Sequence, residues 1–291
     1  MTSGFLVIDK PGGLTSNAVV GRVKAATGIR KVGHAGTLDP MATGVLVVGV
    51  GSVTRLIRFI QDQPKEYVAK AQFGVATDTL DADGAVMSRE PMDFDPKDLA
   101  TVIPRFTGRI HQVPPMVSAL KKDGRRLHEL ARQGVTVDRA PRPVDIFELE
   151  LLAVGPGPYP EIEFRVLCGK GTYIRALADD MAAALGGNAH LTALRRTRIG
   201  SLHVDDALNL DDLQEWQELL LSPSQALGDL PMVMVGPETA AGVNNGMRFV
   251  GGELTGIPET VPVRVIDPAG NLIAVYVREG DRARPEVVLP T

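Results

Sequence analysis

Several stretches of the chain show a regular pattern of apolar and polar positions, and each pattern predicts an element. Residues 44–50 form an almost unbroken apolar run, which is typical of a buried strand. Residues 67–73 alternate between apolar and polar side chains, as a strand with one buried face does, and Tyr67 stands at its beginning. Residues 161–167 repeat this alternation, and residues 5–8 predict a further short strand.

Apolar positions at helical spacing predict two amphipathic helices. The first begins after Thr15 or Ser16, both good N-cap residues, and ends at Gly28. The second runs from about residue 173 to 185 and carries an apolar stripe. We also expect a helix around Trp216, within the acidic stretch 205–218.

The order of these elements indicates an α+β fold with more than one domain. Strands and helices do not alternate regularly, which argues against a doubly wound α/β fold. Residues 111–143 are rich in basic residues and prolines and predict an insertion outside the core. From about residue 231 the chain is rich in Gly and Pro, and two Val-rich runs flank a turn at 267–271. That pattern predicts a hairpin in a small β-rich domain, with a boundary near 222–236.

The composition is that of a soluble globular protein. Hydrophobic residues make up 44% of the chain and charged residues 23%. No apolar run is long enough to span a bilayer, and we find no secretory signal. Cys168 is the single cysteine, so an intrachain disulfide is excluded. We therefore expect a cytoplasmic protein.

The net charge of −4 conceals an asymmetry along the chain. Residues 1–198 carry 26 Lys and Arg against 21 Asp and Glu, whereas residues 199–291 carry 5 against 14. Local basic clusters can bind phosphates even when the net charge is negative, although a solvated surface is the favoured explanation of any single cluster. The clustered basic residues considered as candidates are Lys121, Lys122, Arg125, Arg126, Arg195 and Arg196.

The segment Gly33-His34-Ala35-Gly36-Thr37-Leu38-Asp39-Pro40 places a carboxylate in a glycine-rich turn before the apolar run. Pro40 disfavours the helical region for Asp39, so we expect a restrained, extended backbone there. Such an acid beside a core strand suits a catalytic role. A turn in which Asp39 bonds its own backbone is the alternative.

Several cofactor-dependent chemistries lack their motifs. The five histidines are scattered and no paired cysteines occur, so we expect no metal site. The chain has no phosphate-binding G-x-x-x-x-G-K-[ST] loop, no complete dinucleotide fingerprint and no G-x-S-x-G elbow. What remains is chemistry performed by side chains alone.

Five segments together resemble the TruB-type family of bacterial tRNA pseudouridine synthases over roughly residues 4–200. They are Asp9-Lys10-Pro11-Gly12-Gly13, the segment from Gly33 extended to Gly44, Lys65-Glu66-Tyr67, Lys170-Gly171-Thr172-Tyr173-Ile174-Arg175 and Leu191-Thr192-Ala193-Leu194-Arg195-Arg196-Thr197. The family isomerises the uridine at position 55 in the T-loop of tRNA. The resemblance implies that tRNA is the partner and that no cofactor is used. It also implies a mixed, largely antiparallel sheet in a catalytic domain.

The resemblance also implies bounds for each domain. Residues 1–228 correspond to the catalytic domain, and residues 111–143 correspond to a thumb-like RNA-binding insertion within it. Residues 232–291 stand in the place of the family's PUA domain. We expect no obligate protein partner and a monomer.

The resemblance assigns roles to individual residues. Asp39 matches the catalytic aspartate, Tyr67 the active-site tyrosine, and Arg175 the arginine that pairs with the aspartate. The positions that match substrate contacts are His34, Tyr67, Tyr173 and Leu194, while Lys10 belongs to a supporting motif. The basic residues at 121–126 and 195–196 would hold the RNA backbone. Taken alone, a tyrosine in a strand packs in a core, and Arg175 could form a surface pair with Asp179.

Two other function classes fit parts of this pattern. An RNA-folding protein with a vestigial site would bind tRNA without needing Asp39, although the intact set of Asp39, Tyr67 and Arg175 argues against it. A related synthase acting on ribosomal RNA or within a guide-RNA complex is the second, and the chain has no long basic tail for such an assembly.

Overall fold

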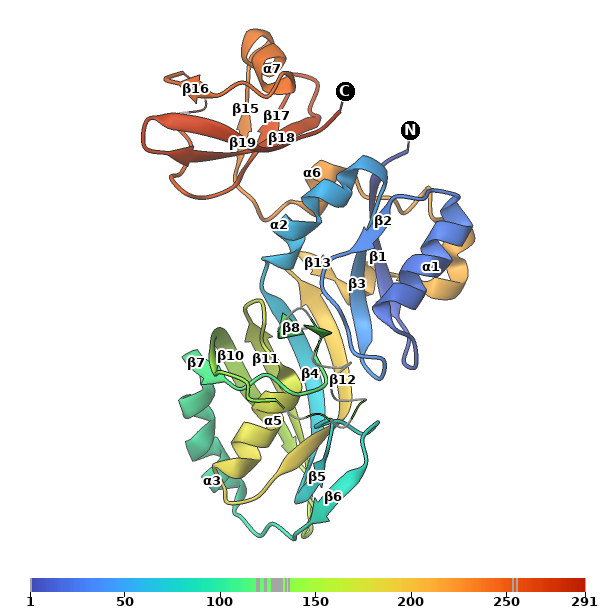
Figure 1. Ribbon diagram of the computed structural model, residues 1–291, viewed down its shortest axis with the longest axis vertical. Helices are drawn as coiled ribbons and strands as arrows, with labels where there is room; N and C mark the ends of the chain where they lie inside the picture. The colour runs from blue at the N-terminus through green and yellow to red at the C-terminus, as the bar shows by residue number, and fades with distance from the viewer. Residues whose placement is uncertain are drawn as a thin grey trace. The chain divides into compact units, whose positions relative to one another are not determined.

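The computed structural model describes residues 2–290 except 119–120, 123–124, 127–132, 134, 136, 253 and 255. Contacts divide the chain into two compact units, drawn in Figure 1. Unit 1 comprises Met1–Asp39, Val45–Gln63 and Gly200–Thr291, and unit 2 comprises Pro40–Gly44 and Pro64–Ile199.

The centre of unit 2 is a sheet with the strand order β12-β4-β11-β10-β7, in which each neighbouring pair is antiparallel. Its strands are β4 (Lys65–Phe73), β7 (Gly108–Gln112), β10 (Arg142–Val154), β11 (Glu161–Cys168) and β12 (Ala189–Ile199). The start of β3 (Thr43–Val50) pairs with β12 in parallel. The mixed, largely antiparallel sheet expected from the resemblance is therefore confirmed.

Helix α5 (Ile174–Ala183) packs against β12 and β4, and Figure 1 shows it in front of these strands. Leu177 is fully buried and Met181 is 1% exposed, so the predicted apolar stripe faces the sheet. The other elements of unit 2 are β5 (Val75–Thr77), β6 (Val86–Arg89), α3 (Pro96–Val102), η2 (Ile103–Phe106), β8 (Lys121–Lys122) and β9 (Arg125–Arg126).

The N-terminal part of unit 1 combines β1 (Gly4–Lys10) with α1 (Ser16–Thr27), as predicted. The Thr15 hydroxyl accepts a hydrogen bond from the Ala18 amide, and Gly28 ends the helix at φ +69°, where glycine is favoured. Strand β2 (Val32–His34) pairs antiparallel with β3, and β14 (Leu208–Asn209) pairs parallel with β1. The short elements nearby are η1 (Gly51–Leu56), α2 (Ile57–Gln61), β13 (Leu202–His203), η3 (Val204–Asp206) and α6 (Pro223–Ala226).

The C-terminal part of unit 1 is a five-stranded sheet of order β15-β17-β18-β19-β16, with α7 (Pro237–Asn244) beside it (Figure 1). Its strands are β15 (Met232–Met234), β16 (Phe249–Val250), β17 (Val263–Ile266), β18 (Leu272–Glu279) and β19 (Arg282–Val288). Antiparallel β17 and β18 form the predicted hairpin. Val243, Val265 and Tyr276 are fully buried in a core of this part's own residues. The β-rich C-terminal part is confirmed, while the domain bounds 1–228 and 232–291 stay a prediction.

The helix predicted around Trp216 is of the 3₁₀ type. Residues Leu210–Glu215 form this helix, η4, which has a kink at Asp212. Leu210, Leu213 and Trp216 are each less than 8% exposed. Their spacing of three residues matches the three-residue turn of a 3₁₀ helix, which brings all three to one side.

Among the described residues, no helix is long and apolar enough to cross a membrane. In the same part of the chain, no group of three or more His, Cys, Asp and Glu side chains could hold a metal ion.

Candidate active site

The backbone before Asp39 is anchored in unit 1. The Ser16 hydroxyl, 2% exposed, accepts a hydrogen bond from the Leu38 amide (2.9 Å) and donates one to the Leu38 carbonyl (3.2 Å). The Ala35 amide donates to the Val47 carbonyl at 2.8 Å. Asp39 itself is half-buried. The main chain that leads into Asp39 is therefore restrained.

The backbone after Asp39 is anchored in unit 2. Thr43 and Gly44 pair with Arg195 and Arg196 of β12. Gly44 has φ +100°, and a Cβ placed on it would lie 2.1 Å from the Arg196 carbonyl oxygen. Only glycine fits such a close approach, so the glycine in the motif serves the pairing of two main chains.

Tyr67 and Leu194 lie on the ladder between β4 and β12. Tyr67 is 8% exposed and stands directly opposite Arg196, while Leu194 is 7% exposed and stands opposite Ala69. The Arg196 Cζ lies 6.0 Å from the centroid of the Tyr67 ring, a cation–π distance. Arg196 is only 1% exposed, and its expected contact to a phosphate of the RNA backbone stays a prediction. Its neighbour Arg195 is half-buried and donates to the Thr43 hydroxyl (3.3 Å).

Tyr173 is held at the N-cap of α5 by a buried glutamine. The Tyr173 amide donates to the Gln112 Oε1 (3.0 Å), and the Gln112 Nε2 donates to the Tyr173 carbonyl (3.3 Å). Gln112 is 1% exposed and lies at the end of β7. A pocket of about 210 Å³ borders this contact and is lined by Gln112, Pro114, Arg142, Pro143, Val144, Gly171 and Tyr173.

Arg175 is buried, with 3% of its surface exposed, and its guanidinium contacts the 78–84 loop and the stretch that contains Val117. It lies 3.2 Å from an Asp81 carboxylate oxygen and donates to the carbonyls of Thr79 (2.7 Å) and Val117 (2.8 Å). The alternative of a surface pair with Asp179 is therefore excluded. Asp179 instead accepts a hydrogen bond from the Ala189 amide. The pairing of Arg175 with Asp39 stays a prediction.

The sequence analysis missed Gln112 and Asp81. A buried arginine requires a buried acceptor, so the acidic loop at 78–84 could have indicated where the partner of Arg175 lies. The loop sequence did not distinguish Asp81, which is 5% exposed, from Asp83, which is exposed. Nothing in the local sequence around Gln112 indicates a contact to a residue 61 positions away.

Lys10 and His34 lie in unit 1. Lys10 is fully buried, and its Nζ donates to the carbonyls of Pro11 (2.9 Å) and Leu14 (2.7 Å). These bonds hold the turn that leads into α1, as a supporting role requires. His34 stands opposite Val48 in the β2–β3 pair, and its carbonyl accepts from Gln61 (3.4 Å). Substrate contacts by either residue stay a prediction.

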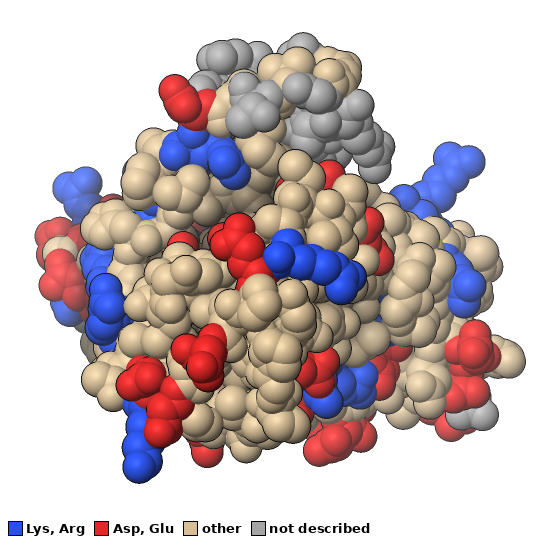
Figure 2. All heavy atoms as spheres, turned by 90° about the horizontal axis from the view of Figure 1, so that it is seen from below, with Lys and Arg blue, Asp and Glu red and all other residues tan. Residues whose placement is uncertain are grey.

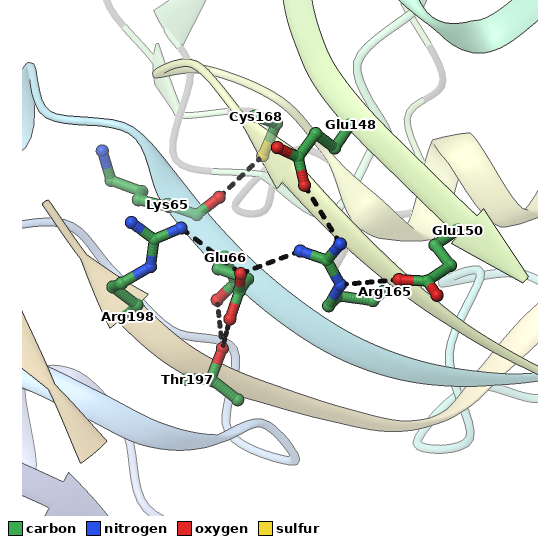
Figure 3. Close-up of polar contacts among 8 residues, drawn as sticks. All are labelled: Lys65, Glu66, Glu148, Glu150, Arg165, Cys168, Thr197 and Arg198. Atoms are coloured by element: carbon green, nitrogen blue, oxygen red, sulfur yellow. Dashed lines mark hydrogen bonds and ion pairs between the residues drawn. The ribbon is translucent and has the colours of Figure 1, made fainter. Parts of the chain in front are cut away.

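A charge network lies on the face of β4 opposite Tyr67, because neighbouring residues of a strand point to opposite faces (Figure 3). Arg165 of β11 contacts Glu66 (3.1 Å), Glu148 (3.0 Å) and Glu150 (3.0 Å). From β12, the Thr197 hydroxyl donates to Glu66 (2.8 Å) and Arg198 lies 3.3 Å from it. Burial raises the pKa of Glu66, but its hydrogen bonds lower that pKa by more, so the net shift is downward.

Cys168, also shown in Figure 3, ends β11 beside Lys65, with its Sγ 3.6 Å from the Lys65 carbonyl oxygen. Burial raises the pKa of this thiol to about 11. The thiol is therefore neutral at physiological pH, and nucleophilic chemistry requires the thiolate.

The basic residues of the insertion form a short pair of strands. Lys121 and Lys122 of β8 stand opposite Arg126 and Arg125 of β9. Among the described residues on the face that Figure 2 shows, Lys and Arg are interspersed with Asp and Glu and form no continuous basic patch. The RNA-backbone contacts of the insertion stay a prediction.

Two family models match adjacent parts of the chain. Residues 24–174 match the TruB family pseudouridylate synthase (N terminal domain), and residues 175–227 match the tRNA pseudouridylate synthase B C-terminal domain. The chain belongs to the TruB family. The tRNA pseudouridine synthase B of Syntrophotalea carbinolica is 44% identical over 285 residues, covering 94% of this chain and 92% of the relative. That of Arthrobacter sp. (strain FB24) is 40% identical, covering 99% and 97%.

Solved structures show the same fold. The structure of a Cbf5-Nop10-Gar1 complex contains a chain that this TruB family member matches with a TM-score of 0.76 and 26% identity, covering 99% of this chain and 85% of that one. A chain of an H/ACA RNP bound to a substrate RNA containing 2′-deoxyuridine matches with a TM-score of 0.75 and 25% identity, with the same coverage. The expected α+β pseudouridine synthase fold is thus confirmed. The protein is a tRNA pseudouridine synthase, an isomerase.

Proposed function

We propose that this synthase acts on the uridine at position 55 in the T-loop of tRNA, with Asp39 as the reacting carboxylate and without a cofactor. The observation that carries the proposal is the anchoring, within unit 1, of the main chain that leads into Asp39. The buried Ser16 hydroxyl bonds both the amide and the carbonyl of Leu38, the residue directly before Asp39. A rigid backbone presents a reacting group in one geometry, as catalysis requires.

The reaction rearranges bonds without a change in composition. The bond between N1 of uracil and C1′ of ribose breaks, the base turns, and a bond between C5 and C1′ forms. The proton leaves C5, and N1 ends with a hydrogen, so no oxidant or reductant is consumed. A carboxylate can assist as a nucleophile on the ribose or on the base, and the proposal covers both routes.

The other candidate residues would hold the uridine and the RNA. Tyr67 offers an aromatic face for a uracil that has left its stack, and Arg175 would be the arginine that pairs with the aspartate. His34, Tyr173 and Leu194 would contact the substrate, supported by Lys10. Contacts to the RNA backbone fall to Arg195 and to the basic residues of the insertion.

The resemblance and the composition also suggest how the enzyme is organised. We place it in the cytoplasm as a monomer. The segment 232–291 would serve as a PUA-like domain.

Asp39→Asn tests the catalytic assignment, because asparagine keeps the size but loses the charge. In tRNA labelled with tritium at uridine C5, this variant should release no tritium while its Kd for tRNA stays unchanged. Asp205→Asn, at an exposed aspartate, is the control and should behave as the wild type. Full activity of Asp39→Asn would refute the assignment.

Stem-loop substrates test the proposed position. A T-arm stem-loop should be modified and an anticodon stem-loop should not. Equal modification of both would refute recognition of the T-loop.

A further inference from the structure

We infer that Gln112 is a positioning residue of this synthase, which acts by fixing the backbone of Tyr173 at the start of α5. The inference rests on the proposed function, because only that function makes Tyr173 and Arg175 site residues. Gln112 was not a candidate in the sequence, and it reaches the site through Tyr173.

The two hydrogen bonds between Gln112 and Tyr173 hold both backbone polar groups of Tyr173. A glutamine amide carries both a donor and an acceptor, so it can bond the N–H and the C=O of the same residue. Tyr173 has the extended conformation in which this is possible, with φ −104° and ψ 107°. The Tyr173 carbonyl also accepts from the Leu177 amide (3.0 Å), the first hydrogen bond of the helix. These three hydrogen bonds therefore fix the backbone of Tyr173 and the direction in which α5 begins.

Helix α5 depends on this contact because no N-cap side chain bonds its first turn. Its N-cap residue is Tyr173, and no side chain caps the helix there. Ser, Thr, Asp or Asn normally accepts a hydrogen bond from the first turn. In α5 the side-chain amide of Gln112, on β7, holds the N-cap residue from outside the helix.

The same stretch that carries Gln112 also holds Arg175. The Arg175 Nη2 donates to the Val117 carbonyl at 2.8 Å, five residues beyond Gln112. The stretch is held in turn by Arg139, whose Nη1 donates to the Pro114 carbonyl (2.9 Å). Two residues of the Lys170–Arg175 motif are thus bonded to the beginning of the insertion, and Gln112 makes the bond that a substitution can remove.

Gln112→Met tests the inference, because methionine has a similar volume and no amide. At saturating enzyme, the single-turnover rate on unmodified tRNA should fall about 10- to 100-fold, the cost of a small displacement of site residues. The Kd for tRNA should not change. Gln72→Met is the matched control: Gln72 of β4 also donates its amide to a carbonyl, that of Tyr159, away from the motif. This control should keep the wild-type rate.

Gln112→Glu supplies a pH-dependent readout, and the Tm of this variant at each pH separates lost positioning from lost folding. A protonated carboxyl has one donor and one acceptor and restores both bonds, whereas a carboxylate turns an acceptor toward the Tyr173 carbonyl. The rate of Gln112→Glu relative to the wild type should therefore rise as pH falls. Burial favours protonation of this carboxyl, and Arg142, directly opposite on β10 and exposed, opposes it. The relative rate of Gln112→Met should not depend on pH.

The inference fails if Gln112→Met retains the wild-type single-turnover rate. It also fails if Gln112→Glu shows no pH-dependent recovery, since the rate loss would then come from a general loss of folding. The proposed function fails by a different result, activity of Asp39→Asn, so the two failures can be told apart.

Discussion

Unit 2 presents its candidate residues in two different ways. Tyr67 and Leu194 lie on the regular β4–β12 ladder, where the register of the strands determines their position. Tyr173 and Arg175 lie at a turn and a helix start, where side chains from distant segments hold them. In a ladder of paired strands, many backbone hydrogen bonds together hold each residue in position. The turn depends on a few side chains, so single substitutions there should have the larger effects.

The largest expected effect is at Asp81. Asp81→Ala removes a buried carboxylate from beside the buried Arg175, and breaking a buried pair in this way costs about 3–5 kcal/mol. Urea denaturation should show this loss in the free energy of unfolding, together with a loss of activity. Asp83→Ala, at an exposed aspartate of the same loop, should cost little. Equal stability of the two variants would show that the turn does not depend on this carboxylate.

Arg196 and Arg195 are neighbours on the ladder for which we expect opposite defects. Arg196→Met removes a guanidinium packed beside Tyr67 and should lower the single-turnover rate about tenfold, close to 1.4 kcal/mol for a desolvated cation–π contact. It should leave the salt dependence of tRNA binding unchanged. Arg195→Met should keep the rate and reduce the slope of log Kd against log salt by about 0.7–0.9 if it loses one phosphate contact. A normal rate and a reduced salt slope for Arg196→Met would instead indicate that Arg196 contacts the RNA backbone.

Glu66 provides a smaller test through pH. Its pKa is lowered in the folded state, so its ionised form stabilises the fold above the unfolded pKa, and this stabilisation is lost as pH falls through the folded value. Glu66→Gln should therefore lower the Tm at pH 7, and the difference should shrink on acidification below the ordinary pKa of 4.5. Glu148→Gln, at a more exposed member of the network, should change the Tm less. A Tm difference that stays constant with pH would exclude the network as its cause.

The smallest effect concerns Cys168. Because burial raises the pKa of its thiol to about 11, the folded protein should not react with a thiol reagent at pH 8. Reaction should appear only after unfolding in denaturant, measured by the release of a chromophore. Rapid labelling of the folded protein would show that this end of β11 opens.

The same comparison explains what the sequence could predict. The alternation at residues 67–73 and the N-cap and glycine signals of α1 depend on neighbours in the chain, and those elements are confirmed. Gln112 is 61 positions from Tyr173, and Asp81 is 94 positions from Arg175. Only the tertiary structure brings each pair together.

The sequence pattern left two features undetermined. Arg196 belongs to a basic cluster in the sequence, but it stands at an inward position of its strand. The apolar spacing around Trp216 fits a 3₁₀ helix, which short patterns do not distinguish from an α-helix.

The most direct test of the account maps pseudouridine at every position of an unmodified tRNA transcript after incubation with the enzyme. The account predicts one product, at position 55 in the T-loop, with the wild type and with Asp205→Asn, and none with Asp39→Asn. Pseudouridine at another position, or at position 55 with Asp39→Asn at the wild-type rate, would contradict it.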